Sequence, residues 1–275
     1  MLLRAALLNL FALRSCNANR QTRHGLDLYH RIANAKHRGE LILLCNRLGL
    51  TGNAAEVGVN RAHFSRHNLE LWEGPTEGKK YYMIDSWAYR ANDTLNGVVS
   101  RDKNTMEAHT YDVQYNIAKA RVLPWLSEGR AVMIRRFSEA AVLDFPDSFF
   151  DFIYIDAGHE YHNVARDLAL WWPKLAPGGM FAGDDFADGH DTAYHFAVSP
   201  TWGVKSALAN FSATVGSPFF LTFADRKHLS YPMTPLSDGP EFDDDPEGLR
   251  GKAIRQGIPS PVRSHSFFPA WYMFK

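Results

Sequence analysis

Residues 151–186 read DFIYIDAGHEYHNVARDLALWWPKLAPGGMFAGDDF, and this stretch decides the fold. The apolar run Phe149–Asp156 is too short for a helix and ends in an acid, as a buried strand does. Apolar residues then recur at helical spacing, at Val164, Leu168, Trp171 and Leu175. Pro177-Gly178-Gly179 is expected to end that helix, and Met180–Gly183 is predicted to be the next strand. This order predicts a βαβ unit with two parallel strands.

The same alternation of short apolar runs and amphipathic segments extends in both directions from this unit. Further strands are predicted at Ala54–Val59, Tyr81–Asp85, Ala131–Arg135, Pro218–Phe223 and Phe267–Phe274. Helices are predicted at Glu40–Leu48, Thr105–Leu126 and Val204–Val215. The pattern therefore predicts an α/β fold: a doubly wound, Rossmann-like, seven-stranded and mostly parallel sheet, with helices on both faces and the last strand antiparallel.

The length of 275 residues suits one large domain, which is predicted over residues 27–275 with a surface insertion near 225–265 that is rich in Pro, Gly, Asp and Ser. Residues 1–26 are predicted to be a leader or targeting-like segment, because arginines occur there but no acidic residue does. A transit peptide, a secretory signal and an ordinary amphipathic helix all stay open. The compartment is therefore unassigned: cytoplasmic, or organellar or secretory if the segment is a signal. The segment is too short and too often interrupted by arginine for a stable membrane span.

The charge balance and the cysteine content limit the classes of binding partner that the protein can have. Thirty Lys and Arg residues balance thirty Asp and Glu residues, so the basic excess typical of nucleic-acid binders is missing and no nucleic-acid partner is expected. The two cysteines, Cys16 and Cys45, cannot build a disulfide framework and match no zinc signature. The expected partner is a small-molecule acceptor, and a homo-oligomer stays open.

Acidic residues follow the predicted strands at the edge where parallel sheets bind ligands. The first strand ends in Glu56-Val57-Gly58, where glycine permits close backbone approach but a full G-x-G-x-x-G is missing. The second ends in Asp85, placed where a carboxylate accepts hydrogen bonds from ribose hydroxyls. These features favour an adenosine-containing cofactor without a pyrophosphate.

A second acidic group follows the later strands, at Asp156, Asp184 and Asp185. Oxygen ligands of this kind favour a hard divalent cation such as Mg²⁺, and the structural alternative is that Asp184 or Asp185 caps a helix. His159 is the residue of this group that titrates near neutral pH, so it is the candidate base, although a lone histidine is more often structural.

Three segments, AEVGVNRAHFS (55–65), YYMIDSW (81–87) and residues 151–186, together resemble class I S-adenosylmethionine-dependent methyltransferases, in the group that includes macrocin O-methyltransferase. The most specific part is the turn D-x-x-H-x-Y followed by an amphipathic helix, P-G-G and G-D-D. The resemblance implies the same Rossmann-like fold, with S-adenosylmethionine as cofactor and methyl transfer as activity.

Site roles follow from the same resemblance. Cofactor-binding positions are Glu56, Gly58, Asp85, Ser138, Glu139 and Asp156. Among them Glu56 and Gly58 would line the methionine and ribose side, Asp85 would hold the ribose hydroxyls, and Ser138 and Glu139 would contact the adenine. Metal ligands of related enzymes, the catechol type included, correspond to Asp156, Asp184 and Asp185.

Two departures from the family pattern stand out. His159 replaces the lysine that the catechol type carries three residues after its first metal aspartate, and Ala62 replaces the closing glycine of the first motif. Because alanine disfavours a left-handed conformation, a helical loop is predicted at Ala62.

The predicted function is methyl transfer from S-adenosylmethionine to a hydroxyl of a small molecule, assisted by a divalent metal and by His159. Four alternatives stay open: a metal-independent methyltransferase, an adenosine-cofactor-binding module without catalysis, a nicotinamide dehydrogenase and a non-haem iron oxygenase. The last two are disfavoured by the missing glycine motif and by the lack of an assured second histidine ligand.

Overall fold

The computed structural model describes residues 38–74, 78–88, 108–191, 200–222 and 268–275. The predicted leader over residues 1–26 and the predicted insertion near 225–265 lie outside this part of the chain, as does the start of the helix predicted from Thr105. Those segments stay predictions.

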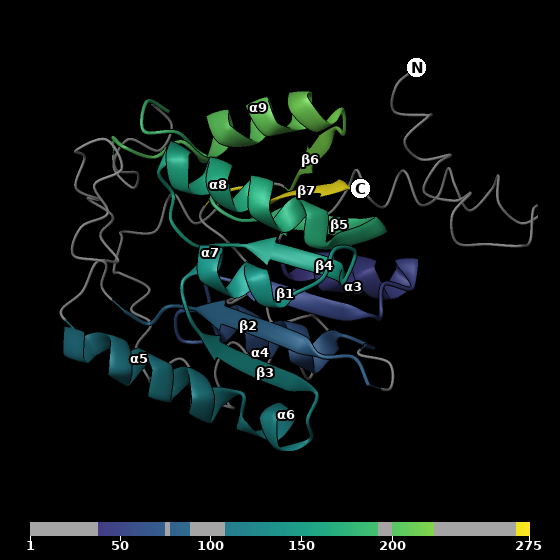
Figure 1. Ribbon diagram of the computed structural model, residues 1–275, viewed down its shortest axis with the longest axis vertical. Helices are drawn as coiled ribbons and strands as arrows, with labels where there is room; N and C mark the ends of the chain where they lie inside the picture. The colour runs from purple at the N-terminus through teal and green to yellow at the C-terminus, as the bar shows by residue number, and fades with distance from the viewer. Residues whose placement is uncertain (1–37, 75–77, 89–107, 192–199, 223–267) are drawn as a thin grey trace, which may run out of the picture.

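A single sheet organises the described residues (Figure 1). Its strands are β1 (Asn53–Val57), β2 (Tyr81–Asp85), β3 (Ala131–Arg135), β4 (Phe150–Ile155), β5 (Leu175–Gly183), β6 (Phe219–Leu221) and β7 (Trp271–Phe274). The seven strands lie in the order β3-β2-β1-β4-β5-β7-β6. Strands β1 to β5 pair in parallel, whereas β7 is antiparallel to both β5 and β6. The predicted Rossmann-like sheet with an antiparallel last strand is confirmed.

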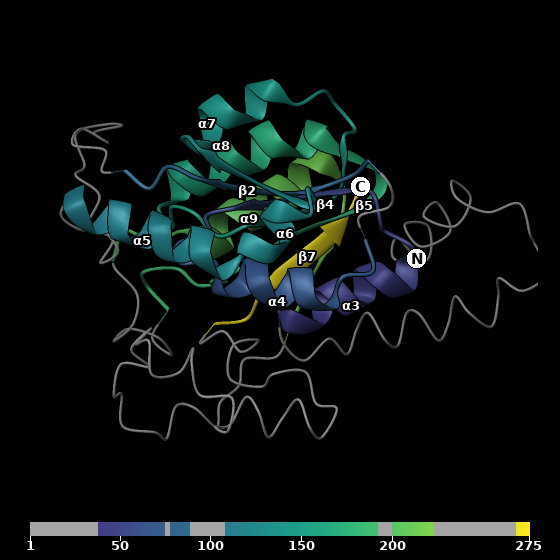
Figure 2. The same ribbon diagram turned by 90° about the horizontal axis from the view of Figure 1, so that it is seen from below.

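Helices cover both faces of the sheet (Figure 2). The main helices are α3 (Gly39–Leu48), α4 (His63–Leu71), α5 (Ala108–Arg121), α6 (Leu123–Ser127), α7 (Ser138–Ala141), α8 (Tyr161–Trp171) and α9 (Val204–Val215). Helices α3 and α4 lie on one face, α7, α8 and α9 lie on the other, and α5 and α6 run beside the edge strand β3 (Figures 1 and 2). The doubly wound arrangement leaves the carboxyl ends of the parallel strands open at one edge.

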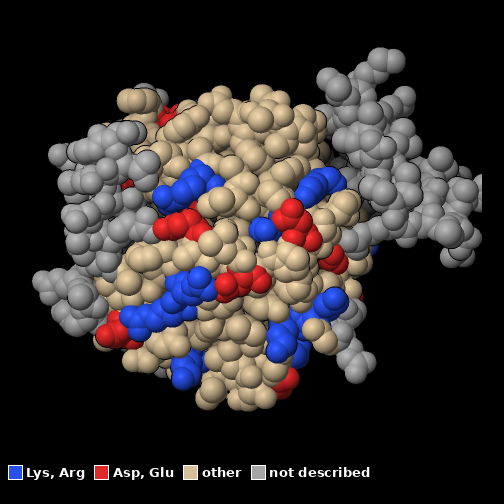
Figure 3. All heavy atoms as spheres, in the orientation of Figure 1, with Lys and Arg blue, Asp and Glu red and all other residues tan. Residues whose placement is uncertain are grey.

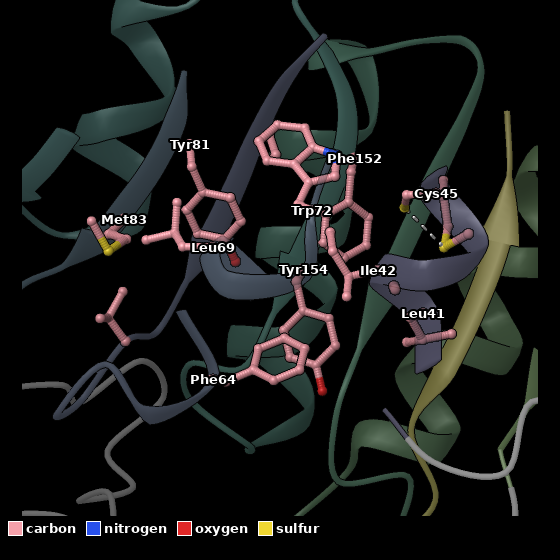
Figure 4. Packing of buried hydrophobic residues seen from close by; sticks show 14 of the residues in the cluster. Leu41, Ile42, Cys45, Phe64, Leu69, Trp72, Tyr81, Met83, Phe152 and Tyr154 are labelled. Atoms are coloured by element: carbon pink, nitrogen blue, oxygen red, sulfur yellow. Dashed lines mark hydrogen bonds between the residues drawn. The ribbon is translucent and has the colours of Figure 1, made fainter. Parts of the chain in front are cut away.

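Strand periodicity creates a separate hydrophobic core on each face. In β4, Phe152 and Tyr154 pack into the core under α3 and α4, while Ile153 and Ile155 pack into the core under α8 and α9. This division follows because successive side chains of a strand point to opposite faces. Figure 4 shows part of the first core, in which the ring of Phe64 lies against that of Tyr154, with ring centroids 4.3 Å apart. Both faces of the central strands are therefore buried, and the site must lie at their ends.

Several predicted boundaries are wrong. Strand β1 ends at Val57 rather than at Val59, and the helix predicted through Leu126 is divided into α5 and α6. The largest difference is at β5, which was predicted to begin at Met180.

Helix α8 ends at Trp171, a 3₁₀ turn covers Trp172–Lys174, and Leu175 begins β5 and pairs with Phe150. Pro173 has no backbone N–H to donate to the carbonyl four residues earlier, so the α-helical hydrogen bonds end before the predicted Pro177-Gly178-Gly179 stop. Leu175 thus belongs to the sheet rather than to the helical stripe.

Candidate functional site

A cavity of about 580 Å³ opens at the carboxyl ends of the parallel strands. Every predicted site residue lines it, namely Glu56, Gly58, Asp85, Ser138, Glu139, Asp156, His159, Asp184 and Asp185. Parallel strands direct their carboxyl ends to one edge, which explains how residues from five strands and the loops after them reach one space. The roles assigned to these residues stay predictions, but their convergence is a property of the fold.

The turn after β1 brings the backbone very close to the neighbouring strand. Gly58 has φ +92°, and a Cβ at this position would lie 1.8 Å from the carbonyl oxygen of Asp156. Its N–H donates to the carbonyl of Ile84 at 2.8 Å. A positive φ and a contact this close both require glycine. Gly58 therefore fixes how closely the β1 and β4 loops approach each other along the cavity wall.

The same turn contains a correction to the sequence prediction. Ala62 is not helical but left-handed, with φ 58° and ψ 33°, and its side chain is fully buried at the start of α4. Its N–H donates to the carbonyl of Val59 at 2.8 Å, which closes the turn. The left-handed conformation costs an alanine about 1–2 kcal/mol. The tight connection from β1 to α4 imposes this conformation despite the local preference of alanine.

Asp85 holds the β1 turn through its carboxylate. Its Oδ2 accepts hydrogen bonds from the backbone N–H groups of Val59 and Asn60, both at 2.9 Å. Its Oδ1 accepts one from the N–H of Trp87 at 2.8 Å. Two carboxylate oxygens offer about four lone-pair sites, so acceptor capacity is left for a ligand. Asp85 thus shapes the turn in addition to facing the cavity.

Glu56 is a buried acid in the wall of the cavity. It is 2% exposed, and the hydroxyl of Tyr81 donates to its Oε2 at 2.7 Å. The pKa of Glu56 is raised to about 8 as the net result of several causes: burial, the largest, and the nearby Asp156 raise it, while hydrogen bonds from Tyr81 and Ser65 and the charge of Arg38 lower it. At neutral pH the folded protein therefore keeps a proton on Glu56 that an unfolded chain would release.

This shifted pKa predicts that stability falls as the pH rises. The pKa of Glu56 is about 8 in the folded state against an ordinary value of 4.5. Between these pH values the folded state binds a proton that the unfolded chain has released, so the free energy of unfolding falls steadily as the pH rises from 4.5 to about 8. Glu56→Gln keeps an acceptor for Tyr81 without the charge. The stability of this variant relative to wild type should rise by about 4 kcal/mol between pH 5 and pH 9, because wild type loses about 1.4 kcal/mol for each pH unit up to the folded pKa.

Urea unfolding at the two pH values measures this difference. Glu70→Gln is the control, because Glu70 lies in an exposed ion pair with Arg66 on α4. If the difference in unfolding free energy between wild type and Glu56→Gln is the same at both pH values, the raised pKa of Glu56 is contradicted.

The predicted adenine side is built around α7 and α8. Ser138 Oγ donates to Asp167 Oδ1 at 2.7 Å and accepts from Trp171 Nε1 at 2.8 Å. Arg166 Nη2 lies 4.0 Å from Glu139 Oε2. Asp167 is 2% exposed and also lines the cavity, although nothing in the sequence pattern separates it from an ordinary helix residue. The hydroxyl of Ser138 is thus engaged within the protein, and Asp167 and Arg166 join the wall.

Asp156, His159 and Asp185 form a compact group at the other end of the acidic wall. Nε2 of His159 lies 2.8 Å from Asp185 Oδ2 and 3.7 Å from Asp156 Oδ1. The imidazole also stacks on Trp202, with ring centroids 4.3 Å apart. Asp185 has φ 56°, which turns the chain sharply after β5. The turn and the stacking hold the three side chains together.

Asp184 has a different partner. Its side chain is 3% exposed, and its Oδ2 accepts a hydrogen bond from the guanidinium of Arg38. The pKa of Asp184 is raised to about 7 as the net result of burial, the largest cause, and of the neighbouring Asp185 and Asp156, which together outweigh the opposing charge of Arg38. Burial disfavours the charge of Arg38, but the surrounding carboxylates, Asp184 first, outweigh it and hold the pKa of Arg38 above its usual value. Arg38 directly precedes α3 and matches no motif, so this ion pair could not be predicted from local sequence patterns.

The donor set fits a divalent cation in part. One donor atom each from Asp156, His159 and Asp185 lies within 4.8 Å of the others. Two carboxylates and one imidazole suit Mg²⁺ or Mn²⁺. Asp184 Oδ1 is buried without a hydrogen-bond partner among the described residues, which indicates unused acceptor capacity beside the group. Of the three predicted ligands, Asp156 and Asp185 lie in this group, His159 joins them, and Asp184 bonds Arg38.

Comparison with known proteins identifies the family. A family model described as "Methyltransferase domain" matches residues 10–186, more than half of the chain. The chain belongs to the methyltransferase domain family. A curated protein of Sinorhizobium fredii, "Uncharacterized protein y4gI", is 26% identical over 118 residues, which is 37% of this chain and 13% of that protein. The chain thus spans a small part of that relative's length.

The methyltransferase domain is also similar to solved structures of two O-methyltransferases. An O-methyltransferase from Bacillus cereus in complex with SAH has 12% sequence identity, covering 81% of this chain and 93% of that chain, with a TM-score of 0.44. The O-methyltransferase NovP has 16% identity, covering 68% of this chain and 74% of that chain, with a TM-score of 0.44.

The surface of the methyltransferase domain is of mixed charge on the face shown in Figure 3, where basic and acidic side chains are interspersed. Ion pairs at the surface of the domain include Arg136 with Asp144 and Lys174 with Asp147. In the described part of the domain, every helix is too short or too polar to cross a bilayer.

Proposed function

We propose that this methyltransferase domain transfers the methyl group of S-adenosylmethionine to a hydroxyl of a small molecule, as in the group that includes macrocin O-methyltransferase. One observation carries the proposal: a single cavity of about 580 Å³ joins the Glu56, Gly58 and Asp85 wall to the Asp156, His159 and Asp185 group. The first wall suits an adenosine cofactor, and the second offers acid and base groups to an acceptor.

The cofactor would lie along the turns after β1, β2 and β3. Gly58 leaves room for the ligand beside the backbone, Asp85 has acceptor capacity for the ribose hydroxyls, and the wall of Ser138 and Glu139 would enclose the adenine. Even with Glu56 protonated, the cavity is lined by more carboxylates than arginines, and this excess of negative charge suits a positively charged sulfonium group. The sulfonium supplies an activated methyl group, so the protein must contribute position and electrostatics.

The acceptor hydroxyl would face His159. In the proposed step the acceptor oxygen loses its proton to the imidazole and forms the new bond to the methyl carbon, while the bond from that carbon to sulfur breaks and leaves S-adenosylhomocysteine. In the metal-assisted form of the proposal, Asp156, His159 and Asp185 would instead hold a divalent metal, with Nε2 of His159 as a ligand. The metal would lower the pKa of a coordinated hydroxyl, whose proton would then pass to solvent rather than to the imidazole. Asp185 beside His159 orients the ring, and Trp202 fixes its plane.

Calorimetric titration with S-adenosylhomocysteine tests the cofactor assignment. Asp85→Ala should weaken binding about 100-fold, because the variant loses the acceptor for the ribose and frees the three backbone N–H groups that shape the β1 turn. Asp147→Ala is the control, since Asp147 forms an exposed ion pair with Lys174 away from the cavity, and its affinity should stay within threefold of wild type.

The outcomes separate the alternatives. A folded wild-type protein that does not bind S-adenosylhomocysteine contradicts the proposed function. Binding that depends on Asp85 supports it, and a screen of hydroxyl acceptors with labelled S-adenosylmethionine then tests transfer. Binding without transfer to any acceptor would favour the cofactor-binding module without catalysis.

A further inference from the structure

Arg38 places a permanent positive charge inside the acidic end of the cavity. The residue directly precedes α3, and its side chain is 18% exposed. Its Nη1 bonds Asp184 Oδ2 and lies 3.5 Å from Asp156 Oδ2. The guanidinium also lies over the ring of Phe64, 5.0 Å from the ring centroid. Arginine cannot lose its proton in a protein, so this charge is present at every working pH.

Asp156 is shared between two positions for a cation. Its Oδ2 faces Arg38, whereas its Oδ1 faces His159 on the side where Asp185 lies. The guanidinium therefore fills the first position, between Asp184 and Asp156. The second position, among Asp156, His159 and Asp185, is the one whose donor atoms lie within 4.8 Å of one another.

The charges fit this division. Counted formally, the side chains of Asp156, Asp184 and Asp185 carry −3 and the guanidinium of Arg38 carries +1, which leaves −2 on the cluster. A divalent ion would neutralise that remainder. A second cation at a shared carboxylate also repels the ion that binds next to it, and this repulsion is strong where water is excluded.

We propose that Arg38 is a built-in counterion that occupies the Asp184 half of the acid cluster, confines a divalent metal to Asp156, His159 and Asp185, and weakens the affinity for that metal. Asp184 then acts as the anchor of Arg38 rather than as a metal ligand. This inference rests on the metal site of the proposed function and adds a residue that sets its occupancy.

Binding of Mn²⁺ to the full-length protein, followed by the paramagnetic resonance signal of the free ion, tests the proposal. Arg38→Gln removes the competing charge and should tighten Mn²⁺ binding at least tenfold. Asp184→Asn leaves Arg38 without its anchor charge and should weaken binding at least tenfold. The double variant Arg38→Gln with Asp184→Asn should return to within threefold of wild type, because both charges are removed together.

The double variant also guards against loss of folding, since removing both partners of a buried ion pair leaves no uncompensated charge. Arg136→Gln is the matched control, because Arg136 pairs with Asp144 in an exposed site outside the cavity, and its Mn²⁺ affinity should equal that of wild type. A double variant as weak as Asp184→Asn would make Asp184 a ligand and overturn the proposal. Unchanged or weaker Mn²⁺ binding by Arg38→Gln would also overturn the proposal. The proposal is likewise overturned if neither the wild-type protein nor any variant binds Mn²⁺.

Titration of the same samples with S-adenosylhomocysteine keeps the two proposals apart. A wild-type protein that binds S-adenosylhomocysteine while the Mn²⁺ results contradict the role of Arg38 leaves the cofactor assignment intact. A wild-type protein that does not bind S-adenosylhomocysteine defeats the proposed function, whatever the Mn²⁺ results show.

Discussion

Gly58→Ala is expected to destabilise the protein by more than about 3 kcal/mol and to abolish binding of S-adenosylhomocysteine. The added Cβ would lie 1.8 Å from the carbonyl oxygen of Asp156 and 2.3 Å from its carbonyl carbon, in a residue whose φ is +92°. Both partners are backbone atoms at the ends of the central strands β1 and β4, which cannot move apart without breaking the ladder that joins them. The clash therefore reaches both walls of the cavity.

Gly129→Ala is the matched control for this change. Gly129 has φ +72°, but a Cβ there would have no neighbour within 4 Å. Only the backbone preference is lost, and the cost should be about 1 kcal/mol with no change in ligand affinity. Thermal and urea unfolding, with titration of the folded fraction, measure the comparison. Equal losses for the two variants would show that the close approach of Gly58 to Asp156 has no energetic weight.

His159→Ala is expected to lower the rate of methyl transfer by about 10²- to 10⁴-fold, while the affinity for S-adenosylhomocysteine changes less than threefold. The imidazole lies between Asp156 and Asp185 and stacks on Trp202, so it is positioned for proton transfer on the acceptor side rather than on the adenosine side. Single-turnover kinetics with an accepted substrate, compared with calorimetric binding, separate the chemical step from cofactor binding.

His162→Gln serves as the control, since His162 lies three residues further along and does not line the cavity. Its rate should stay within threefold of wild type. A His159→Ala variant with a normal rate would mean that His159 only packs against Trp202. Equal losses of rate and of S-adenosylhomocysteine affinity would instead assign His159 to the cofactor, and both results would exclude it as the base.

Local patterns were enough to predict most of the sheet. Tyr81–Asp85 and Ala131–Arg135 were predicted with the bounds that β2 and β3 have, because short apolar runs between polar residues differ clearly from helices. The strand alternation also predicts that two faces are buried. Boundaries failed where two signals competed, as at Leu175, which fits the helical spacing of α8 but pairs with Phe150 in the sheet.

The convergence of the site residues could be predicted because parallel strands end at one edge. Glu56, Asp85 and Asp156 each follow a predicted strand, so the sheet topology alone places them around one cavity. Their hydrogen-bond partners could not be predicted in this way. Asp85 accepts hydrogen bonds from three backbone N–H groups, and Ala62 is left-handed. Both features depend on how the turns after β1 and β2 fold back, which a local pattern does not show.

The amino-acid sequence by itself determined the strand and helix alternation, the two buried faces and the acidic edge where a cofactor would bind, since these follow from periodicity and from the types of residues at strand ends. Only the tertiary structure decided that Arg38 pairs with Asp184, 146 positions away, and that His159 rather than Asp184 lies with Asp156 and Asp185. The physical reason is that periodicity is a local property, whereas contacts between distant segments depend on strand order, on close approaches such as that of Gly58, and on which buried charges find a partner.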